Sequence, residues 1–276
     1  MRSELCLHDL STGATRVLLA TDRLIEAPNW APGGGYLLVN AEGGLFRVSL
    51  DAPDLVPVDL GPHDRLNNDH GISPDGGTHV FCDHSQAGMS VIYTIPAAGG
   101  APRRVTPLGP SWWHGWSPDG ARLAYAAIRD ERFAIATCAL DGSDERILVT
   151  GPGHYDGPDY TPDGHWIWFN ATRGGTMQLW RMPADGGTPE QMTDAPRDAW
   201  FPHPAPGGRH VLYLAYPQGT EGHPRDRDVS LRLIDLETGR DRALFGLFGG
   251  QGTINTPCWA PEGGRFAFCR YAPPPA

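Results

Sequence analysis

The sequence predicts an all-β fold, a six-bladed β-propeller with four antiparallel strands in each blade. Three observations support this prediction. A Pro-containing turn recurs six times along the chain, with its prolines 42, 44, 44, 44 and 55 residues apart. Short apolar runs follow each turn, and the helical i, i+3, i+4 spacing is missing throughout. The two ends of the chain carry complementary parts of one further blade. A period of about 40–45 residues with strand-like content is typical of propeller blades.

The recurring turn has a sequence that favours a tight hairpin connection. Proline presets φ at the first corner, an Asp or Glu can bond its own backbone, and Gly accepts a positive φ. Its six copies contain Pro32, Pro74, Pro118, Pro162, Pro206 and Pro261.

The segments between the turns read as strands. Runs such as 36–39, 79–81 and 166–169 follow a turn directly, a second run such as 91–95 or 178–182 comes next, and a third such as 103–106 or 190–193 comes after a Gly- or Asp-bearing turn. Together with the strand that leads into the turn, each unit has four strands, which we name A to D from the hub outward.

The chain ends predict that the propeller is closed. The last turn is followed by a single strand that ends near residue 271, and residues 4–20 supply the missing pair. We therefore expect the sixth blade to combine about 253–271 with 4–20, which leaves no free sheet edge. Residues 1–276 are predicted to form one propeller domain, because this length lies within the single-domain range of all-β folds.

The turn sequence Ser/Thr-Pro-Asp-Gly, with an aromatic residue two positions before the proline, resembles the repeat of the TolB family of propellers. The aromatic residues are Trp30, Trp116, Tyr160 and Trp259. The resemblance covers nearly the whole chain and implies a propeller fold. We expect no export signal, because the charged start Met1–Leu5 is followed by no apolar segment. We also expect no separate N-terminal domain of the TolB kind.

Composition excludes several classes of partner and compartment. The formal net charge of -10 predicts no nucleic-acid or anionic membrane partner, since phosphate binding needs clustered basic residues. No run approaches the ~18 apolar residues of a membrane span. The five cysteines are odd in number and form no CxxC pair, which favours a reducing cytoplasm.

The longest connections are expected on one face, which we call the upper face: the B–C loops and the D–A crossings meet there. The two longest are 216–228 and 246–255, and both belong to the fifth blade. Long loops on a rigid scaffold usually carry binding sites. The alternative is a mobile, solvated insertion. The glycines at 249, 250 and 252 match no nucleotide-binding pattern, so neither a nucleotide nor an organic cofactor is predicted.

Alignment of the six units on the turn proline points to candidate site residues at the upper mouth of the channel. Four residues before the turn, four blades carry proline and two adjacent blades carry His70 and His114. Six residues before the turn the blades carry Glu26, Asn68, Trp112, Asp156, Trp200 and Asn255. Asp69 and His203 are expected in the same neighbourhood.

This ring has the chemistry of a polar-ligand or divalent-cation site. Imidazole and carboxylate are common ligands of transition metals, so His70, His114 and His203 are candidate ligands for Mn, Ca or Zn. The alternative is that each histidine donates to a backbone carbonyl and orders channel water. Among the loop residues, His223 is a further candidate for ligand binding, and arginines suit carboxylate capture.

The histidine-rich upper face also resembles oligogalacturonate lyase propellers. That resemblance implies a His/Gln-bound metal that acidifies the proton beside a uronate carboxylate. His70, His114, Arg129 and Arg225 would then be the catalytic candidates, and Gln251 a possible ligand. Our first hypothesis is therefore a metal-assisted lyase or related enzyme acting on a small carbohydrate-like molecule. The second is a non-catalytic propeller that binds a protein or small ligand.

Overall fold

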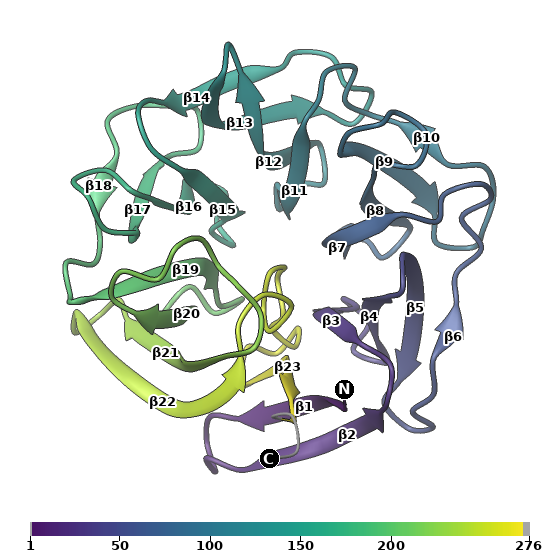
Figure 1. Ribbon diagram of the computed structural model, residues 1–276, viewed down its shortest axis with the longest axis horizontal. Coiled ribbons are helices and arrows are strands. Elements are labelled where there is room, and N and C mark those ends of the chain that lie inside the picture. The colour runs from purple at the N-terminus through teal and green to yellow at the C-terminus, as the bar shows by residue number, and fades with distance from the viewer. Residues whose placement is uncertain (1, 273–276) are drawn as a thin grey trace.

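The protein is a six-bladed β-propeller, as Figure 1 shows in a view along the channel of the computed structural model, which describes residues 2–272. Blade 1 contains β3 (Ile25–Trp30), β4 (Tyr36–Ala41), β5 (Gly44–Ser49) and β6 (Val56–Pro57). Blade 2 contains β7 (Leu66–Ile72), β8 (Thr78–Asp83), β9 (Val91–Pro96) and β10 (Arg103–Arg104). Blade 3 contains β11 (Ser111–Trp116), β12 (Arg122–Arg129), β13 (Arg132–Ala139) and β14 (Arg146–Thr150).

The remaining blades follow the same order around the axis. Blade 4 contains β15 (Tyr155–Tyr160), β16 (Trp166–Ala171), β17 (Gln178–Pro183) and β18 (Glu190–Gln191). Blade 5 contains β19 (Arg197–Pro204), β20 (His210–Pro217), β21 (Arg227–Asp235) and β22 (Arg240–Gly249). Blade 6 contains β23 (Arg265–Tyr271), β1 (Ser3–Asp9) and β2 (Thr15–Thr21). The predicted all-β, six-bladed architecture is confirmed. Within the described part of the chain there is no helix long and apolar enough to cross a membrane.

Blade 6 is closed by both ends of the chain, as predicted. In Figure 1 the purple strands β1 and β2 lie beside the yellow strand β23, and β1 pairs antiparallel with β23 from Ser3↔Tyr271 to Asp9↔Arg265. The innermost strand differs from the prediction. It is reduced to one bridge, Trp259↔Phe266, because the segment before it contains Pro257 and two glycines with positive φ. This irregular segment, 250–258, occupies the place of a strand A and reaches the channel.

The predicted turns form as expected between strands A and B. In the second blade the amide of Gly76 donates to the carbonyl of Ser73 at 2.8 Å, and Gly76 has a φ of 75°. The carboxylate of Asp75 accepts from the Gly77 amide at 2.9 Å. The same carbonyl-to-amide closure recurs in the other five turns. Proline and glycine therefore recur for a conformational reason, which is why the sequence repeat predicts the blades.

Each inner strand contains a β-bulge at the same place. The register shifts fall between the residues six and three positions before the turn proline in blades 1, 4 and 5, and at Leu66/His70 and Trp113/Gly115 in blades 2 and 3. Ala27, Gly157 and Phe201 occupy equivalent bulge positions with φ of 53°, 59° and 53°. Each is followed by proline, which fits where the hydrogen-bond ladder is interrupted. The bulge explains why proline is the common residue four positions before the turn.

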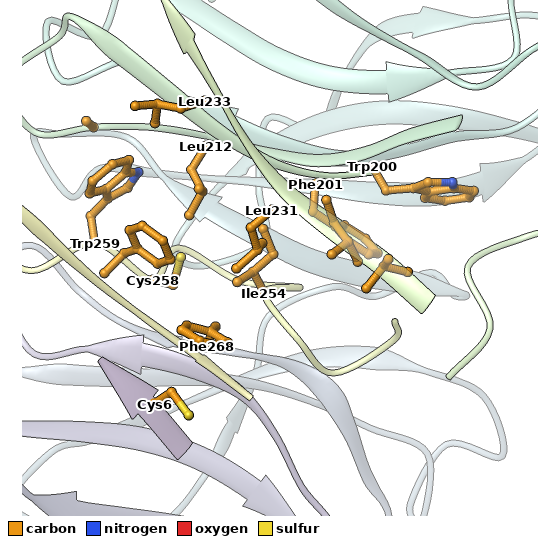
Figure 2. Close-up of a cluster of buried hydrophobic side chains, with 14 of the residues drawn as sticks. Cys6, Trp200, Phe201, Leu212, Leu231, Leu233, Ile254, Cys258, Trp259 and Phe268 are labelled. Atoms are coloured by element: carbon orange, nitrogen blue, oxygen red, sulfur yellow. The ribbon is translucent and has the colours of Figure 1, made fainter. Parts of the chain in front are cut away.

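The core lies between adjacent blades, and Figure 2 shows the part between blades 5 and 6. Phe201, Leu231 and Ile254 belong to this cluster, and Cys6 and Phe268 bring the two chain ends into it. Since these residues come from segments that are distant in sequence, burial of their side chains stabilises closure of the ring.

Candidate active site at the upper end of the channel

A pocket of about 330 Å³ opens at the upper end of the channel. Its walls come from inner strands, from the B–C loops of blades 2 and 5, from the D–A crossing that holds His154, and from the irregular segment of blade 6. The lining residues that carry polar groups into it include Asn68, Asp69, His114, Asp156, His223, Gln251 and Asn255. The two long blade-5 connections therefore meet at this pocket, since 218–226 supplies His223 and 250–258 supplies Gln251 and Asn255.

His114 is the centre of a buried polar network. Its Nε2 lies 2.9 Å from Oδ1 of Asp156, and its Nδ1 lies 3.1 Å from the backbone carbonyl of Asn255. A carbonyl and an ionised carboxylate both accept hydrogen bonds, so the doubly protonated imidazolium satisfies both partners. His114 lies on strand A of blade 3, Asp156 on that of blade 4, and Asn255 in blade 6. The network therefore connects three blades across the channel.

The charges of this network shift the pKa values of its members. Burial alone would lower the pKa of His114, but the charge of Asp156, its hydrogen bond and the charge of Asp69 together raise the pKa to about 9. Burial would raise the pKa of Asp156, but the charge and hydrogen bond of His114 hold that pKa well below its usual range. At neutral pH the pair is therefore an imidazolium–carboxylate ion pair.

Asp69 is a second carboxyl group in the pocket with a different environment. Its Oδ2 accepts from Nδ2 of Asn67 at 2.7 Å, while its Oδ1 lies 3.9 Å from Nε2 of His114 and has no hydrogen-bond partner among the described residues. Burial raises the pKa of Asp69 to about 7, a shift that the charge of His114 reduces and the charge of Asp156 increases. Asp69 is therefore available to exchange a proton with a bound molecule near neutral pH.

Two further imidazoles approach the Asp156 carboxylate from the pocket walls. Nε2 of His154 and Nε2 of His223 lie 3.7 Å and 3.6 Å from Oδ2 of Asp156. Burial lowers the pKa of His223, and its Nδ1 has no hydrogen-bond partner among residues 2–272. His223 therefore presents a neutral ring with one free nitrogen beside the pocket.

Aromatic rings form one wall of the pocket. Trp112 stacks on Phe133 at 6.3 Å between ring centroids, and Phe133 stacks on His154 at 4.2 Å. The ring of Phe201 stacks on His114 at 5.9 Å and meets His223 edge to face at 5.2 Å. The wall is thus continuous from the mouth of the pocket to the buried imidazolium.

Phe201 is held in a strained backbone conformation. A φ of 53° is unusual for a bulky residue and persists only where the surroundings impose it. The amide of Phe201 donates to Oδ1 of the fully buried Asn170 at 3.0 Å. In blade 3 the equivalent amide, that of Trp113, donates to Sγ of Cys82. An acceptor in the preceding blade therefore supports the bulge, and in blade 5 this contact places Phe201 beneath His114.

The structure brings most of the predicted binding residues together. Eight of the predicted site residues line the one pocket: Asn68, Asp69, Trp112, His114, Asp156, His223, Gln251 and Asn255. The alignment on the turn proline located the inner-strand members of this set, because equivalent positions of successive blades meet around the axis. Their roles in binding or catalysis stay predictions.

Other predicted site residues lie outside the pocket lining. His70 is fully buried near the backbone of Leu38 and Ala27, without a hydrogen bond of good geometry to either, and burial lowers its pKa to about 4. Trp200 packs beneath the wall, edge to face with His154 and His223. His70 and Trp200 therefore contact neighbouring protein groups in the positions where the ring hypothesis expected an exposed mouth.

The two arginines predicted as carboxylate clamps are engaged elsewhere. Nη2 of Arg129 lies 2.6 Å from Oε1 of Glu145. Nη1 of Arg225 lies 3.5 Å from Oε1 of Glu26. Neither arginine lines the pocket, because these carboxylates hold both guanidinium groups away from it.

The predicted metal set is not assembled. His203 has its Nδ1 3.0 Å from Oδ2 of Asp159 and its Nε2 2.6 Å from the carbonyl of Ile254. Both ring nitrogens of His203 are therefore occupied, and His70 and His114 have separate environments. Across residues 2–272 no group of three or more His, Cys, Asp or Glu side chains is arranged to hold a metal ion. The residues present do not fit a resident Mn, Ca or Zn ion.

Sequence reasoning missed four members of the pocket, Asn67, Ala126, Phe133 and His154. Phe133 lies on strand C, a strand that the alignment did not search for site residues. His154 lies in a D–A crossing two residues before Asp156. Its position on the upper face was a usable signal, because every D–A crossing ends there.

Comparison with known proteins agrees with this architecture. A family described as the TolB beta propeller domain matches residues 114–263. The uncharacterized protein Atu1656 of Agrobacterium fabrum is 48% identical over 274 residues, which cover 99% of this chain and 94% of that protein. The Tol-Pal system protein TolB of Francisella tularensis subsp. holarctica is 24% identical over 253 residues, which cover 89% of this chain and 56% of TolB. The chain thus spans about half the length of that TolB.

Solved structures support the same grouping. A structure from Agrobacterium tumefaciens named as a TolB candidate has a TM-score of 0.97 and 48% identity, with 99% of both chains covered. An oligogalacturonate lyase in complex with manganese has a TM-score of 0.59 and 16% identity, with 90% of this chain and 74% of that chain covered. The lyase likeness shows the propeller fold alone. On the family match and the 48% identity, this chain belongs to the TolB beta propeller domain family.

Proposed function

We propose that the upper pocket binds a small, hydroxyl-rich molecule of the carbohydrate type and supplies a proton-transfer group to it. One observation carries the proposal: the buried carboxyl of Asp69 has a free Oδ1 in the pocket while the nearest cation, His114, is paired with Asp156. Oδ2 of Asp69 already accepts from Asn67, whereas Oδ1 accepts no hydrogen bond from the described residues and can accept one from a bound donor. A ligand hydroxyl is such a donor.

The charges of the pocket favour a neutral ligand over an anionic one. The sequence contains no lysine, and no arginine lines the pocket. The one strongly held cation, His114, is neutralised by Asp156. A uronate carboxylate would therefore meet Asp69 and Asp156 without a cationic clamp, which opposes its binding. A neutral sugar avoids this repulsion.

The remaining groups suit a sugar ring. The Trp112–Phe133 wall offers an apolar surface on which a ring face can stack. The amide groups of Asn68, Gln251 and Asn255 lie among the lining residues, and Nδ2 of Asn68 has no partner among the described residues. A ligand with several hydroxyls can satisfy these groups and Asp69 at once.

The pocket could also support general acid–base chemistry. A carboxyl with a pKa of about 7 is present in both protonation states at neutral pH, so Asp69 can accept a proton from a ligand hydroxyl or carbon acid and return it. The imidazolium of His114 lies 3.9 Å away and stabilises the ionised form of Asp69. A lyase or hydrolase reaction on an oligosaccharide is compatible with these two groups, and no step needs a metal ion.

A second candidate is a non-catalytic binding scaffold. Both ring nitrogens of His114 have partners within the protein, Asp156 and the Asn255 carbonyl. A histidine held in this way can serve to fix the channel in one conformation and need not act on a ligand. In this case Asp69 would bind a ligand and transfer no proton.

Ligand screening followed by product analysis separates these possibilities. We expect a neutral mono- or oligosaccharide to raise the Tm of the wild-type protein, and a matched uronide to have less effect. The Asp69→Asn variant should lose the shift, while Asp185→Asn, which removes an exposed carboxylate in a blade-4 turn, should retain it. A shift that is equal in wild type and Asp69→Asn would overturn the binding proposal. Product formation is monitored by chromatography and ultraviolet absorbance. A ligand that binds but yields no product would leave only the scaffold function.

A further inference from the structure

The opposite end of the channel holds a second pocket, also of about 330 Å³. It shares no lining residue with the upper pocket. Four of its lining residues are aromatic and occupy equivalent positions, two residues before the turn proline of blades 1, 3, 4 and 6. These residues are Trp30, Trp116, Tyr160 and Trp259. Five of the six turn prolines, all but Pro261, complete the rim. This lower pocket is therefore an aromatic bowl formed by the blade repeat itself.

The lower pocket contains a carboxyl group among its aromatic walls. Asp159 lines the pocket, and its Oδ2 lies 3.0 Å from Nδ1 of His203. Nε2 of His203 donates to the Ile254 carbonyl at 2.6 Å, so both ring nitrogens of His203 are engaged. Burial raises the pKa of Asp159, and the hydrogen bond with His203 opposes that shift. Oδ1 of Asp159 accepts no side-chain hydrogen bond among residues 2–272. Asn29, which is 5% exposed, also lines the pocket, and its Oδ1 has no partner there.

The turns around the lower pocket add negative charge on one side. Asp75, Asp119 and Asp163 occupy equivalent positions in blades 2, 3 and 4 and accept hydrogen bonds from Ser73, Ser117 and Thr161. These hydrogen bonds lower the pKa of each carboxyl, so all three are ionised at neutral pH. None of the three is in an ion pair within the described chain. The arc they form raises the local concentration of cations.

One cation of the chain already uses this aromatic rim. Cζ of Arg265 lies 5.3 Å from the centroid of the Trp30 ring, and Nε of Arg265 lies 2.7 Å from Oε1 of Glu262. The other three aromatic residues of the rim have no such partner among the described residues. Aromatic faces with a nearby carboxylate are the usual environment for ammonium and guanidinium groups.

We propose that the lower pocket binds the head group of a small organic cation, an alkylammonium or alkylguanidinium. Asp159 would pair with the positive charge of the head group, and Oδ1 of Asn29 would accept a hydrogen bond from a head group that has an N–H. Trp116, Tyr160 and Trp259 would surround it. The volume accommodates one head group with a short substituent. The upper pocket and the lower pocket would then be two separate sites on opposite faces.

The test uses choline and its neutral carbon isostere dimethylbutanol as probes of the full-length protein. Binding is followed by the indole NH resonances of Trp116, in the lower pocket, and Trp112, in the upper pocket, assigned with Trp→Phe variants. We expect choline to shift the Trp116 resonance with saturation and to leave Trp112 unmoved, and the isostere to bind at least fivefold more weakly. Equal affinities for choline and the isostere would overturn the proposal.

Variants connect the response to the named groups. Asp159→Asn keeps the side-chain shape and should weaken choline binding at least fivefold. Trp116→Leu should weaken choline binding by a similar factor. Because Trp116→Leu removes the indole reporter, its binding is followed by the ring resonances of Tyr160. Asp22→Asn, which changes the net charge equally but removes an exposed carboxylate between β2 and β3 on the upper face, should have no effect. Unchanged affinity in both pocket variants contradicts the site. N-acetyl-arginine amide serves as a peptide-like probe, and if it binds tenfold tighter than choline, the occupant is a protein side chain and the small-molecule assignment is wrong.

Discussion

Replacement of His114 by Gln is expected to remove a pH dependence of folding that the wild-type protein shows between about pH 6.5 and 9. In the folded protein the pKa of His114 is raised to about 9, against 6.5 for an ordinary histidine. Because the folded pKa is the higher one, the folded state holds the proton more tightly. The stabilisation is therefore complete below about pH 6.5 and is lost as the pH rises through 9.

The size of the effect follows from the pKa difference. One pKa unit corresponds to about 1.4 kcal/mol, so a shift of this size corresponds to on the order of 3 kcal/mol. This figure is an upper value, because Asp156 belongs to the same buried pair and the interaction must not be counted for both partners. Between about pH 6.5 and 9, the contribution of His114 to the free energy of unfolding is expected to fall by at least about 1 kcal/mol.

The assay is urea unfolding followed by tryptophan fluorescence at pH 6, 7.5 and 9.5. Other groups also titrate: burial raises the pKa of Cys6 and Cys138 to about 11, which favours the unfolded chain above pH 9. Asp69 also titrates near pH 7 and is affected by the charge of His114, so the two proteins are compared in the Asp69→Asn background. Since both retain the thiols, the difference in unfolding free energy between them reports His114 and its pairing with Asp156. That difference should be large at pH 6 and small at pH 9.5. A difference that is constant over the range would refute the ion pair with Asp156.

Two further predictions concern the packing that supports the channel. A Cβ added at Gly71 would lie 2.1 Å from the Trp113 ring, so Gly71→Ala should lower the free energy of unfolding by about 1–3 kcal/mol in the same urea titration. The control is Gly33→Ala, because a Cβ at Gly33 would meet no atom within 4 Å. This variant should change the free energy of unfolding by less than about 0.5 kcal/mol. Asn170→Ala removes the acceptor of the Phe201 amide and should cost about 1–3 kcal/mol. An unchanged unfolding midpoint in Gly71→Ala or Asn170→Ala would contradict the described packing.

The fold was predictable because each blade repeats one conformational requirement. A turn with Pro at its first corner and Gly at a positive φ has to recur wherever strands A and B connect, and the spacing of Pro74, Pro118 and Pro162 therefore predicts equal blades. The closure by 4–20 was predictable from strand counting. The loss of the inner strand in blade 6 was not, because the contacts that hold 250–258 come from other blades, for example His114 to the Asn255 carbonyl.

The site was predictable in position and less so in detail. Equivalent positions of successive inner strands surround the axis, which is why Asn68, Trp112 and Asp156 were located together from the alignment. The alignment cannot give side-chain direction, because the bulge re-aims residues near it. His70 and His114 occupy equivalent sequence positions, yet only His114 reaches the pocket.

The central claim is that the upper pocket is the binding site for a neutral, hydroxyl-rich ligand. Titration of the wild-type protein with neutral saccharides, with the indole NH resonance of Trp112 as the reporter, tests it most directly. The account predicts a saturable shift of the Trp112 resonance that disappears in Asp69→Asn, with Trp116 unmoved. A saccharide that binds and shifts only Trp116, or one that shifts Trp112 equally in Asp69→Asn, would contradict it.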